Sequence, residues 1–497
     1  MKVALVAEGC YPYVVGGVSS WIHSLIRSFP EVEFSVIAIL SNRSQRGKFV
    51  YDQPPNLTDI YEVYLQDLDW SRSNRRGTRS DELAWLRLSP ARYAALRSLI
   101  LGDEIDWDGV FQIFQDKKLS VNKLLMSPPF LSIAIELYQR QYQDITFSDF
   151  LWTLRSIYLP LFITLTFHPP KADIYHCVAT GYSGIIGSMA KSLWTGTHMI
   201  VSEHGIYTRE REEELIKAKW VHGIYKDIWI QQFRKMSLCA YHYADCVTAL
   251  FAQAQELQRE LGCPSEKQLV TSNGIDPERF AACPGKAADD PFINIGAVLR
   301  VTPIKDVKTM INAFDLAKRR EPRLKLWIMG PEDEDPQYAA ECHKLVETLH
   351  TPDVVFTGRI QTTEYLGQMD FTILTSISEG QPLTILEGYS VHKPAIATDV
   401  GNCRGLIEGE NGDTLGAAGI VTPVMNISAI ADAILRLASS AALRRQMGDI
   451  GYQRLQNKYR IEYMIRQYQQ LYQRLGPGAP PDTVEKEVAP WQASVSN

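Results

Sequence analysis

The chain has 497 residues, of which 45% are hydrophobic, so it is long enough for two or three domains with their own cores. Its formal net charge of −6, with no compensating basic stretch, argues against nucleic acid as the main partner. The eight cysteines include no Cys-x-x-Cys pair, so neither a zinc site nor a disulfide framework is indicated, and we expect small buried side chains in a reducing compartment.

The N-terminal segment predicts a short buried strand rather than a signal peptide. Residues 3–8 are apolar as far as Glu8, and only one basic residue precedes them. We therefore expect the protein in the cytoplasm. A helix over residues 18–26, with its apolar side chains on one face, leads to a second strand over 34–40. This alternation predicts an α/β domain in which helices cover both faces of a parallel sheet.

The loop between this strand and this helix ends in Gly16-Gly17. A backbone without Cβ can come close to a phosphate and can adopt positive φ, so both glycines are candidates for contacting a ligand phosphate. A simple tight turn is the alternative. The loop is not the dinucleotide fingerprint, because the chain contains no Gly-x-Gly-x-x-Gly.

Residues 42–170 lose the regular alternation and predict a large, mostly helical insertion, with helices over 81–101 and 120–143. Two Asp-x-Asp sequences, beginning at Asp67 and Asp106, resemble metal-binding pairs. No strand precedes either one to aim it at a diphosphate, so we expect solvated acids and no metal.

The longest apolar stretch, residues 157–167, is shorter than the ~20 residues that a transmembrane helix needs, and it contains Pro160. It predicts a buried helix–strand segment. A surface that skims a membrane, or that docks on a membrane protein, is the alternative.

Alternation returns with four further predicted strands, over residues 172–178, 199–205, 243–250 and 268–276. His204 lies at the end of the second of these, where an imidazole can donate to a sugar hydroxyl or position an acceptor. A histidine held by hydrogen bonds in a loop is the alternative. His176, at the end of the first, is predicted to be structural.

Small residues, prolines and aspartates over residues 281–291 predict a domain linker. The first domain is therefore predicted over 1–283 and the second over 292–458, followed by a helix over 459–475. Residues 476–497 cannot build a core and are predicted to be disordered.

Two cations follow the first strand of the second domain. Residues 294–299 predict this strand, Arg300 and Lys305 come after it, and an amphipathic helix starts at Val307. A departing nucleoside diphosphate gathers negative charge on its pyrophosphate. Two cations at this place stabilise the transition state more than the ground state. A solvated surface charge is the alternative for each cation taken alone.

A strand, a polar turn and a helix surround Glu379 and Glu387. Residues 371–374 predict a buried strand, and Pro382 opens a helix where a missing N–H costs nothing. A helix N-terminus at the carboxyl edge of a sheet is a binding site for an anion. Two carboxylates beside it suit sugar hydroxyls, because an ionised carboxylate accepts two hydrogen bonds at once.

These motifs resemble those of glycosyltransferase family 4, a family of retaining GT-B enzymes. The resemblance rests on Arg300 with Lys305 and on the Glu-x7-Glu pair of Glu379 and Glu387, and it covers most of the chain except the insertion and the tail. It implies a GT-B fold, in which two Rossmann-like domains face each other across a cleft. The helix over 459–475 would cross back onto the first domain.

The resemblance also implies a role for each candidate residue. Glu387 would bind the ribose hydroxyls and Glu379 the donor sugar, while His204 would lie near the anomeric carbon. Arg300 and Lys305 would replace the metal that other glycosyltransferases use, so neither a metal nor another cofactor is expected. The remaining donor-binding candidates lie in turns around the nucleotide: Gly16, Gly17, Arg359, Ile360, Gly380, Gln381, Pro382, Leu383 and Thr384.

At a finer level, residues 3–21 and the helical insertion resemble the cytosolic glycosyltransferases of Pel exopolysaccharide biosynthesis. This implies a hexosyltransferase that uses a UDP-hexose donor and a growing polysaccharide as acceptor. It also implies membrane-embedded synthesis and export proteins as partners. Two alternatives stay open: a nucleotide-sugar-binding scaffold that catalyses nothing, and a GT-B nucleotide-sugar epimerase.

Overall fold

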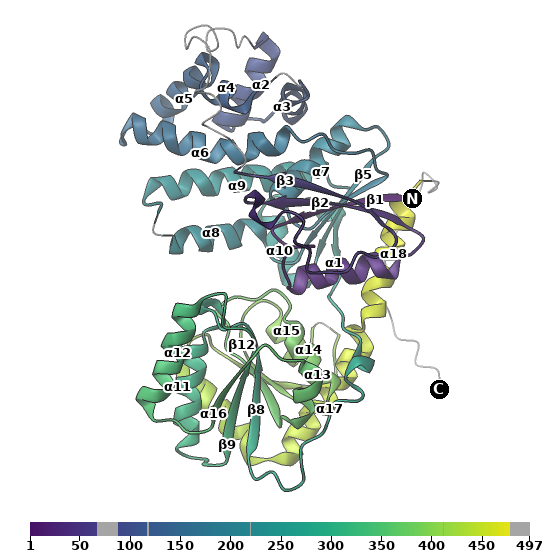
Figure 1. Cartoon of the computed structure of the whole chain (residues 1–497), viewed down its shortest axis with the longest axis vertical. Coiled ribbons are helices and arrows are strands. Elements are labelled where there is room, and N and C mark those ends of the chain that lie inside the picture. Colours follow the sequence, from purple (N-terminus) through teal and green to yellow (C-terminus); the bar gives the residue numbers. More distant parts are fainter. Residues whose placement is uncertain (67–87, 117–118, 219, 411, 478–497) are drawn as a thin grey trace. The chain divides into compact units, whose positions relative to one another are not determined.

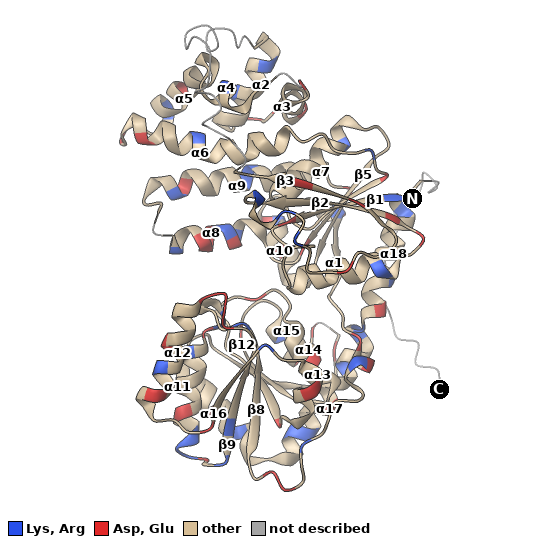
Figure 2. Ribbon diagram, viewed as in Figure 1, with Lys and Arg blue, Asp and Glu red and all other residues tan. Residues whose placement is uncertain are grey.

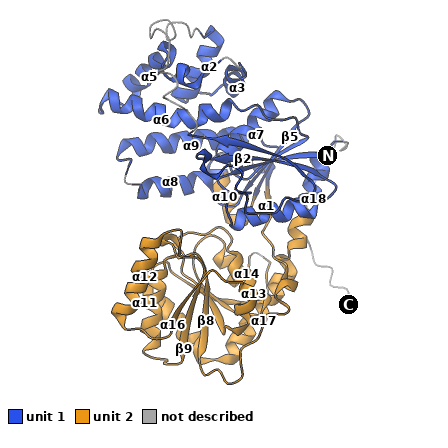
Figure 3. Ribbon diagram, viewed as in Figure 1, with its two compact units in different colours: residues 1–248, 259–268, 467–497 blue, residues 249–258, 269–466 orange. Residues whose placement is uncertain are grey.

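The computed structural model describes residues 1–66, 88–116, 119–218, 220–410 and 412–477. The chain divides into two compact units (Figure 3), each of which contains a sheet covered by helices (Figure 1). Unit 1 comprises residues 1–248, 259–268 and 467–497, and unit 2 comprises residues 249–258 and 269–466.

Within the described residues, the sheet of unit 1 has seven strands in the order β3-β2-β1-β4-β5-β6-β7. The strands are β1 (Lys2–Glu8), β2 (Glu33–Leu40), β3 (Leu57–Tyr64), β4 (Ile174–Cys177), β5 (His198–Glu203), β6 (Cys246–Ala249) and β7 (Gln268–Val270). The pairs from β3 through β5 are all parallel. The chain builds outward from β1 in both directions, so the switch point of this sheet lies between β1 and β4.

Helices cover this sheet because its central strands are apolar on both faces, as residues 3–7 of β1 are. The helices of unit 1 that belong to the strand–helix alternation are α1 (Gly17–Ser28), α7 (Tyr182–Leu193), α8 (Tyr207–Lys217) and α9 (Ile224–Tyr243), while α10 (Ala252–Glu260), after β6, falls mostly in unit 2.

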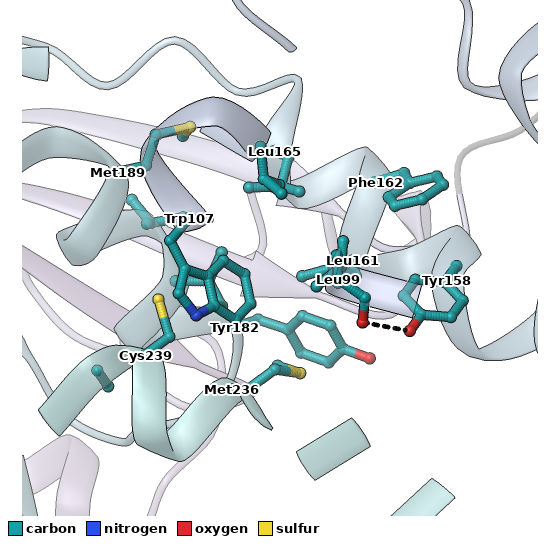
Figure 4. Packing of buried hydrophobic residues seen from close by; sticks show 14 of the residues in the cluster. Leu99, Trp107, Tyr158, Leu161, Phe162, Leu165, Tyr182, Met189, Met236 and Cys239 are labelled. Carbon is teal, nitrogen blue, oxygen red and sulfur yellow. Dashed lines mark hydrogen bonds between the residues drawn. The ribbon is translucent and has the colours of Figure 1, made fainter. Parts of the chain in front are cut away.

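The insertion contributes five further helices among the described residues: α2 (Pro90–Leu101), α3 (Trp107–Phe114), α4 (Val121–Leu125), α5 (Pro128–Gln141) and α6 (Phe147–Leu165). Both α2 and α5 begin with proline after a serine whose hydroxyl caps the helix, at Ser89 and Ser127. Figure 4 shows side chains of the insertion packed with Met189 of α7 and Met236 of α9. The insertion therefore extends the core of unit 1.

Three predictions about this region need correction. Part of the range expected to be helical insertion is strand β3, which pairs with β2 at the edge of the sheet. The predicted helix over 120–143 is two helices, because Pro128 starts a new one. The apolar residues 157–165 are helical throughout, around Pro160, because an apolar run alone does not distinguish a buried helix from a strand.

The acids of the Asp-x-Asp sequence that begins at Asp106 make hydrogen bonds within the insertion and to neighbouring helices. Asp106 caps α3 by accepting from the N–H of Gly109 at 2.9 Å. Asp108 accepts from the hydroxyls of Ser192 at 2.5 Å and Tyr243 at 2.7 Å. The sequence that begins at Asp67 lies outside the described residues.

The sheet of unit 2 is parallel and has six strands, within the described residues, in the order β10-β9-β8-β11-β12-β13. They are β8 (Ile293–Val298), β9 (Leu324–Met329), β10 (Val354–Gly358), β11 (Phe371–Leu374), β12 (Ala395–Thr398) and β13 (Gly419–Thr422). The helices are α11 (Val307–Lys318), α12 (Pro336–Leu349), α13 (Thr362–Tyr365), α14 (Leu383–Ser390), α15 (Cys403–Glu408), α16 (Ile427–Ser439) and α17 (Ala441–Lys458). The switch point lies between β8 and β11.

The unit boundaries differ from the predicted domain boundaries. Residues 269–283 were expected in the first domain and belong to unit 2, because Ile275 pairs with Arg460 in a parallel bridge. Helix α18 (Ile461–Leu475) begins in unit 2, and its second half belongs to unit 1. The predicted disordered tail falls almost wholly outside the described residues.

The second half of α18 is held on unit 1 through buried hydrogen bonds. The hydroxyl of Tyr472 lies 2.8 Å from Nδ1 of His176, and the hydroxyl of Tyr468 lies 3.1 Å from that of Ser202. Burial lowers the pKa of His176 to about 3, so its ring is neutral at pH 7. His176 thus has the structural role that its sequence position predicts. No helix among the described residues is both long enough and apolar enough to cross a membrane.

Candidate functional site

Two predicted site residues that are 74 positions apart form an ion pair at the switch point of unit 2. Lys305 follows β8, Glu379 follows β11, and the Nζ of Lys305 lies 2.5 Å from Oε1 of Glu379. Their side chains are only 17% and 11% exposed, respectively. The hydroxyl of Ser376 also donates to Oε1 of Glu379, at 2.5 Å. The pair is therefore sheltered and oriented, as a preorganised charge site requires.

The loops that carry this pair are fixed to each other. The hydroxyl of Thr375, at the end of β11, donates to the carbonyls of Lys305 and Asp306, both at 3.1 Å. The N–H of Ile377 donates to the carbonyl of Ile304 at 2.8 Å. Because β8 and β11 are neighbours in the sheet, segments distant in sequence meet at one edge.

Arg300 lies after the same strand as Lys305 but has a different partner. Its guanidinium forms an ion pair with Glu334, in the loop after β9, and it is 53% exposed. Exposed ion pairs contribute about 1 kcal/mol at most, so an arriving phosphate can replace this carboxylate. Of the two cations predicted to bind the diphosphate, Lys305 pairs with Glu379 and Arg300 with Glu334.

Helix α14 starts beside this ion pair. Pro382 is its N-cap residue, and the first N–H groups, those of Leu383 and Thr384, have no acceptor one turn earlier in the helix. These N–H groups and the helix dipole favour an anion at this end. Glu387 lies four residues beyond Leu383, on the same side of the helix.

Burial changes the titration of Glu387. Desolvation raises the pKa of its carboxyl group to about 7, and the nearby Arg279 opposes the shift. The sequence predicted an ionised carboxylate here. The structure corrects this, because near pH 7 the free protein carries a mixture of acid and carboxylate.

Donor affinity should therefore depend on pH through Glu387. Ribose hydroxyls donate to the carboxylate, so binding favours the ionised form, and UDP affinity should rise roughly tenfold between pH 5.5 and 6.5 and level off above pH 7. The folding stability of the free protein depends on pH in the opposite direction. Because the pKa of Glu387 is raised in the folded protein, stability should fall as pH rises from 4.5 towards 7. Calorimetric titration of UDP across this range measures the effect.

The control is the exposed Glu364 of α13. Glu387→Gln should flatten the pH profile of UDP binding, whereas Glu364→Gln should keep it. A wild-type affinity that is constant from pH 5.5 to 7 would contradict the assignment of Glu387 to the ribose.

The side chain of Gln381 fixes a neighbouring loop to the site. Its side-chain Oε1 accepts from the N–H of Asn273 at 2.9 Å, and its Nε2 donates to the carbonyl of the same residue at 3.1 Å. The side chain predicted to bind the donor is thus occupied in bracing a loop, and only the backbone of Gln381 is free for a ligand. Sequence reasoning could not pair Gln381 with Asn273, because the two residues are 108 positions apart.

Two other predicted donor contacts follow β10. Arg359 is exposed, and Ile360 packs against the core of unit 2. Gly358 before them has φ of +66°, which turns the chain sharply at the end of the strand. Both residues lie at the carboxyl edge of the sheet, and their contact with the base stays a prediction.

Sequence reasoning missed Gly401 and Asn402, which follow β12. The N–H of Asn402 donates to the carbonyl of Gly380 at 2.8 Å. A Cβ at Gly401, whose φ is +52°, would lie 2.2 Å from the carbonyl oxygen of Glu379 and 2.3 Å from that of Gly380. This turn therefore supports the loop that carries Glu379. The feature of the sequence that could have indicated this turn is a glycine shortly after a predicted strand.

Gly401→Ala should displace the Glu379 loop and lower transfer activity by roughly a hundredfold, as a misplaced catalytic group does. Gly412→Ala is the matched control. Gly412 also has positive φ (+85°), but nothing lies within 4 Å of its Cβ position. Initial rates and melting temperatures of both variants separate the clash from general backbone strain. Equal activity losses in the two would contradict this role of Gly401.

In unit 1, the glycine pair adopts a conformation different from the expected one. Gly16 is the N-cap residue of α1 with φ of −178°, which is extended backbone, and neither glycine has positive φ. Both are exposed, and a Cβ at either would meet nothing within 4 Å. The fold of the chain therefore does not itself require glycine here.

His204 follows β5, as predicted. Its ring contacts that of Trp21 at a centroid distance of 4.4 Å. Burial lowers the pKa of His204 to about 4, so the imidazole is neutral at pH 7. Its Nε2 is buried and has no hydrogen-bond partner within the described chain. A neutral ring with an unused nitrogen can donate to, or accept from, a ligand hydroxyl.

Within the parts of the chain that are described, no three His, Cys, Asp or Glu side chains gather as they would around a metal ion. The cysteines with described side chains are all free thiols.

Two family models match the chain. Residues 1–266 match the model described as domain of unknown function DUF3492, and residues 292–440 match that described as glycosyl transferases group 1. EpsD of Bacillus subtilis (strain 168), named as a glycosyltransferase, is 26% identical over 56% of this chain and 71% of its own length. The amylovoran biosynthesis glycosyltransferase AmsK of Erwinia amylovora is 27% identical over 37% of this chain and 44% of its own length.

Solved structures share the fold over nearly the whole length. HepE of Anabaena, in complex with UDP and glucose, has a TM-score of 0.58 at 12% identity, covering 95% of this chain and 99% of that one. Sucrose-phosphate synthase of Thermosynechococcus elongatus has a TM-score of 0.59 at 16% identity, covering 95% and 98%. The fold is GT-B, as predicted. The chain belongs to the family described as domain of unknown function DUF3492, through residues 1–266, and its residues 292–440 are similar to the glycosyl transferases of group 1.

Proposed function

We propose that the protein is a retaining hexosyltransferase that moves a hexose from a UDP-sugar to a growing exopolysaccharide of the Pel type. It would work in the cytoplasm, beside the membrane-embedded proteins that synthesise and export the polymer. The observation that carries the proposal is the sheltered Lys305–Glu379 ion pair next to the N-terminus of α14.

The side chains and N–H groups at the carboxyl edge of the unit 2 sheet suit a nucleotide sugar. The helix N-terminus and Lys305 supply positive charge for a diphosphate, and Arg300 can exchange Glu334 for a phosphate. Glu379 and Glu387 are left to accept hydrogen bonds from sugar and ribose hydroxyls. Arg359 and Ile360, at the end of β10, are assigned to the base.

The relatives support the donor and the pathway class. A structure of HepE with the same fold holds UDP-glucose, which favours a UDP-hexose here. AmsK is named for the biosynthesis of amylovoran, and CapM of Staphylococcus aureus for that of a capsular polysaccharide. The Pel assignment rests on the resemblance of residues 3–21 and the insertion to PelF, the glycosyltransferase of Pel synthesis.

In the proposed reaction, the bond between the anomeric carbon and the diphosphate oxygen breaks. The acceptor oxygen bonds to the anomeric carbon on the face that the diphosphate leaves, so the configuration is retained. The acceptor proton passes to the leaving phosphate oxygen. Lys305 stabilises the charge that develops on that oxygen, and from unit 1 the glycine pair and the neutral His204 are assigned to the donor phosphate and sugar.

A thermal-shift screen of nucleotide sugars with the full chain tests the donor, because a ligand of the folded state raises the melting temperature. We expect UDP-hexoses to raise it more than GDP-hexoses do. Incubation of the best donor without acceptor then tests the reaction class. Accumulation of the epimeric nucleotide sugar would identify an epimerase, and no turnover with polysaccharide acceptors would identify a scaffold.

A further inference from the structure

Four aromatic rings form a continuous row between α8 and α9. Trp220 contacts Trp229 at a centroid distance of 6.0 Å, Trp229 contacts Phe233 at 5.8 Å, and Phe233 contacts Tyr207 at 5.8 Å. Trp229 and Phe233 are four residues apart, on one face of α9. Figure 1 shows α8 and α9 side by side, joined at the end away from the sheet.

The inner end of the row lies at the switch point of unit 1. The hydroxyl of Tyr207 donates to Oε1 of Glu8, the last residue of β1, at 3.1 Å. The other oxygen of Glu8 accepts from the N–H of Ser183, in α7, at 3.2 Å. A Cβ at Gly181, just after β4, would lie 2.2 Å from the ring of Tyr207. Tyr207 is therefore fixed against the carboxyl edge of the sheet, which is where open α/β sheets bind their ligands.

The outer end of the row is exposed. Trp220 is 70% exposed, while Tyr207 and Phe233 are buried and Trp229 is half-buried. Trp220 does not belong to the core that includes the other three rings. Tryptophan is on average a highly buried residue, so an exposed ring supported by a row of buried ones points to a ligand.

The surroundings of the row suit a glycan. The C–H faces of a pyranose ring are apolar, and they fit the electron-rich face of an indole. Hydrogen-bonding groups lie along α8, where acidic and basic residues alternate (Figure 2). Arg211 lies 5.5 Å from the Tyr207 ring centroid and 2.7 Å from Glu214. Carboxylates and a guanidinium beside aromatic rings match the hydroxyls and faces of sugars.

A membrane surface is the competing ligand, because Ile216 near Trp220 is also exposed. Binding to anionic lipid requires a basic surface. Helix α8 carries four glutamates (Glu210, Glu212, Glu213 and Glu214) against three basic residues (Arg209, Arg211 and Lys217), so it is not basic. The charges therefore favour a neutral glycan.

We propose that the exposed ring of Trp220, which Trp229 supports in a perpendicular, edge-to-face contact, is a stacking platform for the oligosaccharide acceptor, and that Phe233 and Tyr207 connect this platform to the edge of the sheet. This proposal rests on the proposed function and adds the acceptor site to it. The platform would favour long acceptors over short ones, because only a chain of several sugars can contact Trp220 and the sheet edge together.

Trp220→Ala tests the platform in the full chain, with Trp220→Phe as the conservative variant and Trp152→Ala as the control. Trp152 is also exposed, at 57%, but lies on α6 of the insertion. The probes are the linear hexaoses of cellulose, amylose and chitin. Binding of at least one hexaose should weaken roughly tenfold in Trp220→Ala and little in Trp220→Phe or Trp152→Ala. UDP binding should be unchanged in all three.

Two results would overturn the platform: wild-type protein that binds none of the hexaoses, or Trp220→Ala that binds them as tightly as wild type. Trp220 would be assigned to a membrane surface instead if vesicles with anionic lipid bound wild type but not Trp220→Ala, and if the substitution left hexaose binding unchanged. UDP binding distinguishes these results from failure of the proposed function, because it reports on the site in unit 2 independently of the acceptor.

Discussion

Lys305→Ala should reduce hexose transfer by roughly a thousandfold, with the fold retained. The variant removes the sheltered cation that pairs with Glu379 and that stabilises the leaving diphosphate in the proposed reaction. Because this stabilisation is stronger in the transition state than in the ground state, kcat should fall more than the affinity for donor. Initial rates of UDP release in the presence of acceptor measure the loss.

The matched control is Lys308→Ala. Lys308 lies three residues further on and forms an exposed pair with Glu341 at 2.5 Å. It should keep near-normal activity. Removing one partner of a buried pair also destabilises a protein, so Lys305→Ala and Glu379→Ala should be compared with the double variant. A double variant that regains stability without activity separates the catalytic role from the structural one. Near-normal turnover by Lys305→Ala would refute the role of this lysine.

Arg454→Met should cost about 3–5 kcal/mol of folding stability, the cost of breaking a buried ion pair. Arg454, in α17, has no exposed side-chain surface, and its guanidinium donates to Asp413 at 2.7 and 3.1 Å. It also donates to the carbonyls of Leu406, Ile407 and Gly416. Methionine would leave these acceptors buried without a donor. Urea unfolding followed by the circular dichroism of the helices measures the change.

Arg445→Met, at an exposed position of the same helix, is the control and should change stability by less than about 0.5 kcal/mol. The pKa of Asp413 is held below its usual value, in spite of its burial, by hydrogen bonds from Arg454 and from the N–H of Leu415. Adding Asp413→Asn to Arg454→Met should therefore recover part of the loss. A loss below 1 kcal/mol in Arg454→Met alone would show that the pair is not a main stabilising contact of unit 2.

Local sequence patterns predicted the strands and helices around the site of unit 2. The apolar run of β11, the polar turn after it and Pro382 identify the start of α14 to within one residue, because each signal is local. The ion pair between Lys305 and Glu379 is a contact between distant segments. That both residues belong to one site was predicted from a family resemblance rather than from their spacing.

The contacts that site residues make with other loops could not be predicted from the sequence. Arg300 pairs with Glu334, Gln381 braces Asn273, and Gly401 packs under the Glu379 loop. Each of these contacts depends on the order of strands in the sheet, which alternation alone does not give. The raised pKa of Glu387 depends on burial, which is likewise a property of the assembled unit.

A crystal structure of the full chain with bound UDP tests the central claim most directly. The diphosphate should lie over the N-terminus of α14, within hydrogen-bonding distance of the N–H groups of Leu383 and Thr384, with Nζ of Lys305 turned towards it. The ribose hydroxyls should contact the carboxylate of Glu387. A nucleotide bound away from this helix, with the Lys305–Glu379 pair unchanged, would contradict the account.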